Sequence, residues 1–119
     1  MPIKPEIAYG TSARAELNAD GIPVWDTGRE DATFTLDVEI TNIDKFTQLN
    51  SEEVTYVWSV SSDLGNDLTA FGVDPTNANK AELVIMNPKD GNACNFYCEV
   101  INKLAGKEEK SETLHFIVY

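Results

Sequence analysis

The run Ala32-Thr33-Phe34-Thr35-Leu36-Asp37-Val38-Glu39-Ile40 carries the clearest structural signal of the chain, because apolar and polar residues alternate along it. Every second residue of a β-strand points to the same face of its sheet. One face carries Phe34, Leu36, Val38 and Ile40, and the other carries Thr33, Thr35, Asp37 and Glu39. This pattern predicts an antiparallel strand with one face in the core and one in water.

Alternation of the same kind recurs along the chain, and no segment keeps the 3.6-residue period of a helix. The residues that share one face are Val54, Tyr56, Trp58 and Val60 in 54–60, Cys94, Phe96, Cys98 and Val100 in 94–101, and Leu114, Phe116 and Val118 in 112–119. Further strands are predicted over 6–9, 68–73 and 81–86, with turns over 74–77 and 87–92, a polar connection over 41–53 and a charged hairpin tip over 102–111. Segments 13–18 and 22–25 are predicted as edge strands, with a single helical turn over 13–18 as the alternative. About seven or eight short strands separated by turn residues predict an all-β antiparallel sandwich.

Length and charge narrow the class of protein. The chain has 119 residues, enough for a single domain over 1–119, of which 1–27 is the less regular part. Nine Lys and Arg residues face twenty Asp and Glu residues, so the formal net charge is -11. This charge argues against nucleic acid and anionic membranes as partners, because both attract basic surfaces. No apolar run approaches the roughly 20 residues of a spanning helix, and the start Met-Pro-Ile-Lys-Pro-Glu lacks the features of a secretory signal.

The two cysteines, Cys94 and Cys98, lie four residues apart in one predicted strand. At that separation their Cα atoms are roughly 13 Å apart, whereas a disulfide needs them within about 7 Å. We therefore expect two buried, reduced thiols. The alternative is a metal site that includes the single His115. Three such ligands lack the paired spacing of a zinc site, so the sequence predicts no metal and no cofactor.

One constellation is more specific than alternation. Leu83-x-Ile85-x-Asn87 is followed by Phe96-x-Cys98, with Cys98 fifteen residues after Leu83, and Trp58 lies upstream in a predicted strand. This arrangement resembles the immunoglobulin domain, whose strand E carries Leu-x-Ile, whose strand F carries Tyr-x-Cys and whose strand C carries the core Trp. The resemblance covers 28–119. It implies an immunoglobulin-like sandwich with the core signature Trp58, Leu83, Ile85, Phe96 and Cys98.

The chain departs from that family at two positions. Leu36 or Val38 occupies the strand B position of the partner cysteine, so the inter-sheet disulfide is missing. Phe96 occupies the tyrosine-corner position and has no hydroxyl group. Such a disulfide stabilises a domain by about 2–4 kcal/mol, and burial of an apolar side chain in its place contributes roughly 1.5–3 kcal/mol. We therefore expect the sandwich to form without the disulfide.

The run Val54-Thr55-Tyr56-Val57-Trp58-Ser59-Val60 resembles strand C of the highly immunogenic outer capsid protein family of tailed bacteriophages. Those proteins decorate capsid surfaces with immunoglobulin-like domains. The resemblance implies a non-enzymatic virion protein, made in the host cytoplasm and placed on the capsid surface. It implies the major capsid protein or another virion protein as the partner, with the host cell surface as a further candidate. Outward carboxylates predicted at Asp37, Glu39 and Glu99 would present an acidic face.

Few residues suggest chemistry. His115 is predicted on the outward face of the last strand, without a nucleophile beside it. The adjacent pairs Glu52-Glu53 and Glu108-Glu109 would point apart on a strand. The run Asp63-Leu64-Gly65-Asn66-Asp67 offers oxygen ligands for calcium, with an ordinary turn as the other interpretation, and it lacks regular ligand spacing. The sequence therefore predicts no enzyme. Trp25 is the candidate partner contact, and the alternative is that it plugs the open end of the sandwich.

Three functions are compatible with these features. The leading hypothesis is capsid decoration. The second is a structural module of a phage tail or fibre, which would form stable oligomers. The third is a bacterial surface adhesion module, which needs an exposed aromatic platform.

Overall fold

The computed structural model describes residues 2–10, 16–25, 32–46, 49–62, 65–87 and 94–118. Within these ranges the chain is all-β, with short helical turns in the connections. Its elements are β1 (Ile7–Tyr9), β2 (Glu16–Leu17), β3 (Pro23–Trp25), β4 (Ala32–Ile40), α1 (Ile43–Phe46), β5 (Glu53–Ser61), the 3-10 turns η1 (Leu68–Phe71) and η2 (Pro75–Asn77), β6 (Glu82–Asn87), β7 (Cys94–Leu104), β8 (Lys107–Lys110) and β9 (Leu114–Val118). None of the helices in these ranges is long and apolar enough to cross a membrane.

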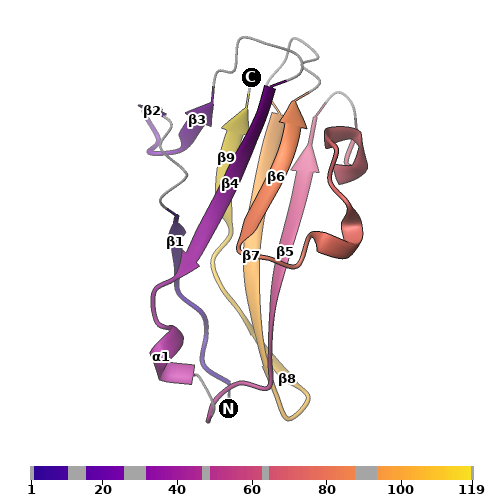
Figure 1. Cartoon of the computed structure of the whole chain (residues 1–119). Helices are drawn as coiled ribbons and strands as arrows, with labels where there is room; N and C mark the ends of the chain where they lie inside the picture. The colour runs from indigo at the N-terminus through magenta and orange to yellow at the C-terminus, as the bar shows by residue number, and fades with distance from the viewer. Residues whose placement is uncertain are drawn as a thin grey trace.

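The strands form two sheets that pack face to face (Figure 1). The smaller sheet has the order β1-β4-β6 and is antiparallel throughout. The larger sheet has the order β2-β3-β9-β7-β5, and β8 also pairs with β7. Only one described pairing is parallel, that of β3 with β9. The molecule measures 46 × 30 × 18 Å, and the described chain begins and finishes at opposite ends of its long axis (Figure 1).

The core lies between the two sheets and contains most of the alternating apolar residues that the sequence predicts, whereas Ile40 and Val54 are only half-buried. Its buried members are Leu36, Val38, Trp58, Val60, Phe71, Val73, Leu83, Ile85, Cys94, Phe96, Cys98, Phe116 and Val118. The Phe116 ring contacts Tyr9 edge-on at a centroid distance of 5.0 Å and Trp58 at 5.6 Å. The side chain of Phe34, which the alternation predicts on the same face, lies outside the described residues.

Asp37 is a correction to the predicted wet face of β4. Its side chain is only 7% exposed, although its neighbours Thr33 and Glu39 are exposed as predicted. The backbone N–H of Gly10 donates to the Asp37 carbonyl at 2.9 Å, and a Cβ atom at Gly10 would overlap with the Asp37 carboxylate. A side chain at residue 10 would therefore displace the Asp37 carboxylate from its present position.

The predicted strand over 68–73 is wrong, because the chain forms η1 there. The Asp67 carboxylate accepts a hydrogen bond from the Thr69 N–H at 2.9 Å and so caps the 3-10 turn. Gly72 ends the turn in the left-handed region, with φ at 76°. A capping aspartate and a terminating glycine outweigh the apolar residues between them. The following turn over 74–77 is confirmed as η2, which Asp74 caps.

The predicted hairpin tip over 102–111 is much shorter than expected. Strand β7 continues to Leu104, and only Ala105 and Gly106 separate it from β8. Both turn residues have positive φ, 53° and 79°, as two-residue hairpins of this twist require. Asn102, predicted in the tip, is completely buried.

The N-terminal part largely follows the prediction. The predicted first strand is confirmed as β1, and Glu16–Leu17 is a strand, so the helical turn considered for 13–18 is wrong at these residues. The polar connection over 41–53 contains the single helical turn α1, which buries Phe46. The predicted turn over 87–92 lies almost wholly outside the described residues.

Candidate functional site

The outer face of the larger sheet carries a stacked aromatic pair. Tyr97 on β7 and His115 on β9 lie directly opposite each other in the strand register. Their rings stack, with centroids 4.8 Å apart and planes 14° apart. Directly opposed side chains on one sheet face are close enough to interact, so the register of β7 with β9 brings the two rings together.

Two hydrogen bonds fix His115, one at its ring and one at its backbone carbonyl. Its Nε2 atom lies 2.8 Å from Oδ1 of Asn95, where the ring N–H donates to the amide oxygen. Its backbone carbonyl accepts a hydrogen bond from the Tyr9 hydroxyl at 2.7 Å. Partial burial lowers the pKa of His115 below its ordinary value of 6.5. The imidazole is therefore neutral at physiological pH and acts as a fixed, flat surface beside Tyr97.

A shallow hollow of about 310 Å³ adjoins this aromatic pair. It is lined by Val57 and Ser59 of β5, Tyr97 and Glu99 of β7, and Thr113 before β9. Val57 is 38% exposed and lies opposite Glu99 in the β5–β7 register. An exposed valine, a half-buried tyrosine and a carboxylate suit the non-covalent binding of one partner side chain.

The five residues of the predicted core signature are all buried between the sheets. Trp58, Phe96 and Cys98 come from the larger sheet, and Leu83 and Ile85 from the smaller. The Trp58 indole N–H donates to the Lys80 carbonyl at 2.8 Å, which satisfies its one polar atom. The side chains of this signature fill the core, whereas other residues line the outer-face hollow.

Both cysteines are buried and form no disulfide, as predicted. Burial raises the pKa of Cys98 to about 12, and the neighbouring Glu99 carboxylate contributes to this rise. A thiol with such a pKa stays protonated and unreactive near neutral pH.

The structure describes only in part the candidate contact residue Trp25 and the 63–67 turn that was considered for calcium. The backbone of Trp25 lies in β3 opposite Val118, but its side chain lies outside the described residues. Residues 63 and 64 of the considered calcium turn lie outside them too. Within the described ranges, no three His, Cys, Asp or Glu side chains gather to hold a metal ion.

The acidic face predicted from Asp37, Glu39 and Glu99 does not form. Asp37 is buried, Glu39 is exposed on the smaller sheet, and Glu99 is half-buried on the larger sheet. Alternation predicts that these residues face water, but it does not indicate which sheet each strand joins.

The Tyr97–His115 pair was not singled out from the sequence. Both residues alternate with inward-facing neighbours, so each could be placed on an outer face. Their contact depends on the register between β7 and β9, which the break at 111–113 sets. Comparison of the chain with protein-family models, with curated proteins and with solved structures found no match.

Proposed function

We propose that the chain is a non-enzymatic, immunoglobulin-like domain of a tailed-phage virion that binds the outer capsid surface. The hollow beside Tyr97 and His115 carries this proposal. It offers a preformed aromatic and apolar surface among polar side chains, and such surfaces bind other proteins.

The strand order supports an immunoglobulin-like interpretation. The smaller sheet would correspond to strands A, B and E, and the larger sheet to strands C, F and G with β5, β7 and β8–β9. Trp58 lies on β5, the counterpart of strand C, and packs beside Cys98 in its β7 partner register. The turns η1 and η2 stand where strand D would run. The two cysteines form no disulfide, and the Cys98 thiol packs in the core instead.

The capsid as partner rests on the sequence of β5. The run that resembles strand C of the outer capsid protein family forms an edge strand of the larger sheet and supplies Val57 to the hollow. The net charge of -11 would keep crowded copies on a shell apart and soluble.

Co-sedimentation with phage shells from the source host tests this function. We expect the chain to pellet with shells at physiological salt. Val57→Asp places a charge in the hollow and should reduce the bound fraction by at least about tenfold. Leu49→Asp is the matched control, because Leu49 is 84% exposed on a loop outside the hollow. A chain that ignores shells, or equal loss in both variants, would contradict the proposal.

One observation favours the adhesion module as a second candidate. The ring of Tyr97 lines the hollow, and carbohydrate rings pack against aromatic rings of this kind. Binding to host-surface glycans, with no binding to shells, would select this function. Stable oligomers that ignore both would select the tail or fibre module.

A further inference from the structure

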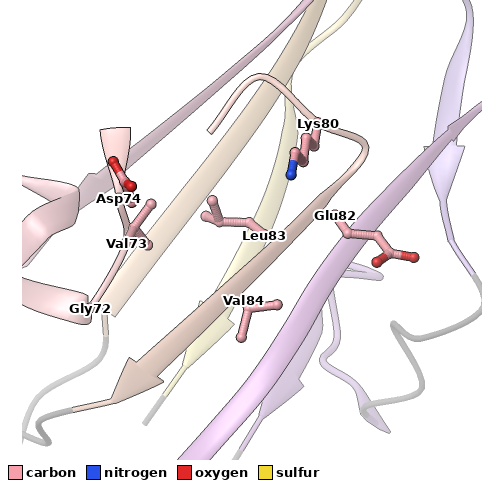
Figure 2. Close-up of a pocket in the computed structure, with 7 residues that line it drawn as sticks. All are labelled: Gly72, Val73, Asp74, Lys80, Glu82, Leu83 and Val84. Carbon is pink, nitrogen blue, oxygen red and sulfur yellow. The ribbon is translucent and has the colours of Figure 1, made fainter. Parts of the chain in front are cut away.

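We propose that the outer edge of β6 is a second binding site, which takes a short extended segment of a basic partner protein by adding it to the smaller sheet. This inference goes beyond the proposed function, because the site lies on the other sheet. It starts from a cleft of about 370 Å³ beside the edge (Figure 2).

The backbone of β6 offers unused hydrogen-bonding groups to this cleft. The Val38 N–H donates to the Ala81 carbonyl at 3.0 Å, and these two residues lie opposite each other in the continued β4–β6 register. Bonded and non-bonded pairs alternate in an antiparallel ladder. Glu82, Val84 and Met86 therefore point their N–H and C=O groups away from β4. Among the described residues, no backbone hydrogen bond joins β6 to the 65–80 segment on that side.

The cleft exposes only part of this edge. Figure 2 shows the segment Gly72–Asp74 on one side, Glu82–Val84 on the other, and Lys80 at one end. A Cβ atom at Gly72 would lie 3.6 Å from Cβ and 4.0 Å from the backbone N of Met86, so Gly72 covers the Met86 end. The open stretch is Glu82–Val84, which fits a short extended segment and not a long strand.

Both walls of the cleft are fixed to the core. Phe71 and Val73 are buried, and the Phe71 ring contacts Phe96 edge-on at 5.2 Å, which anchors the Gly72–Asp74 wall. At the other end, the Lys80 carbonyl accepts the Trp58 indole N–H. The site is therefore formed before any partner arrives, which lowers the entropic cost of binding.

The free edge of β5, in the larger sheet, is protected by a side chain. The backbone N–H of Tyr56, on the free edge of β5, donates to the Asn79 side-chain oxygen at 2.6 Å. Exposed edges tend to pair with other chains unless something blocks them. The edge of β5 is blocked at this point, whereas no such group among the described residues bonds the outward-pointing backbone groups of Glu82 and Val84. This contrast favours strand addition at β6.

Charge and side-chain positions select the occupant. A strand beside β6 would place alternate side chains next to Glu82 and Val84 on the outer face, where Val84 is 56% exposed. Glu82 is exposed beside the open stretch, although its carboxylate points away from the cleft in Figure 2, and the chain carries a net charge of -11. The matching segment has a Lys or Arg two residues from an apolar residue. A second copy of this chain fits less well. It has the same net charge, and its own Gly72–Asp74 segment would clash with that of the first copy.

Amide hydrogen exchange with two blocked peptides tests the site. The basic probe is Thr-Lys-Thr-Val-Thr and the acidic probe is Thr-Glu-Thr-Val-Thr. In the free chain we expect the Val84 amide to exchange fast and the Leu83 amide, which bonds β4, to exchange slowly. The basic peptide should slow the Val84 amide by roughly tenfold, and the acidic peptide should leave it unchanged.

Two variants separate strand addition from general charge attraction. Val84→Pro removes the N–H that faces the cleft, while no bond to β4 is lost, so it should abolish the effect of the peptide with Leu83 still protected. Glu82→Lys should reverse the preference to the acidic peptide. Glu39→Lys, with the same change of charge on exposed β4 surface, should keep the basic preference.

Three results would overturn the proposal. They are a Val84 amide already protected in the dilute free chain, equal protection by both peptides, and protection that rises with chain concentration in the absence of peptide. The last would assign the edge to a second copy. None of these measurements involves phage shells, so the site can fail or succeed independently of the proposed function.

Discussion

At the scale of single residues, the core thiol has a clear chemical consequence. Cys98 is completely buried, and burial raises its pKa to about 12. Because only the thiolate reacts, we expect neither Cys98 nor the buried Cys94 to react with iodoacetamide in the native chain at pH 8. Both should react once the chain is unfolded in guanidinium, and mass spectrometry counts the adducts. Modification of either thiol at a native-state rate near that of free cysteine would contradict the buried placement.

His115 makes the stability of the fold depend on pH. Burial lowers its pKa in the folded chain below 6.5, so the unfolded chain binds the proton first as the pH falls. The free energy of unfolding should therefore be fully retained above pH 6.5 and decrease from there down to the lowered pKa. Urea unfolding of the wild type and His115→Gln measures this. A slope in this window that is the same in both proteins would show that another group causes it.

Two polar residues, Asp37 and Asn102, differ from the prediction made from the sequence. Alternation predicts that Asp37 faces water, and the polar run 102–111 predicts that Asn102 lies in a loop. Both side chains are buried. In each case a distant segment covers the residue. The chain after β1 covers Asp37 through Gly10, and Ile3 with Asn50 covers Asn102. Local pattern carries no record of such contacts, so the buried polar residues were not predictable from it.

At the scale of elements, Asn102 joins three parts of the chain. Its side-chain amide donates to the Ile3 carbonyl and to the Asn50 carbonyl, both at 2.9 Å. Asn42 holds the same N-terminal segment by accepting the Glu6 N–H at 2.8 Å and donating to the Lys4 carbonyl at 3.0 Å. The segment before β1 is thus fixed to β7 and to the end of β4 by side-chain amides.

We expect Asn102→Ala to lower the free energy of unfolding by about 1–3 kcal/mol, because it leaves the two carbonyls without their donor. Urea denaturation measures the loss. Asn66→Ala is the matched control, since Asn66 is exposed, and its effect should stay within about 0.5 kcal/mol. Equal stability of the two variants would mean that Asn102 does not fasten the N-terminal segment.

The strands themselves were largely predictable, and the connections were not. The buried residues of β5 and β9 and the buried apolar residues of β7 are those expected from alternation, because every second residue of a half-buried strand faces the core. The 68–73 segment failed because its form is decided by Asp67 and Gly72 at its two ends. The outer-face hollow needed the pairing of three strands at once, which alternation does not specify.

At the scale of the whole molecule, the two proposed binding surfaces lie on different sheets. The outer face beside Tyr97 and His115 is proposed to hold the chain on a shell, and the β6 cleft is proposed to take an extended basic segment. A chain with both surfaces could bridge a shell and a further protein. Shell binding should then leave the exchange of the Val84 amide unchanged.

Hydroxyl-radical footprinting of the chain, free and bound to phage shells, would identify the face that meets the capsid. We expect binding to protect Tyr97 and His115 from oxidation. Met86, 49% exposed on the outer face of the smaller sheet, and Leu49 should be labelled equally in both states. Unchanged labelling of Tyr97 and His115 in the bound chain, with protection at Met86 or Leu49, would contradict the assignment of the binding face.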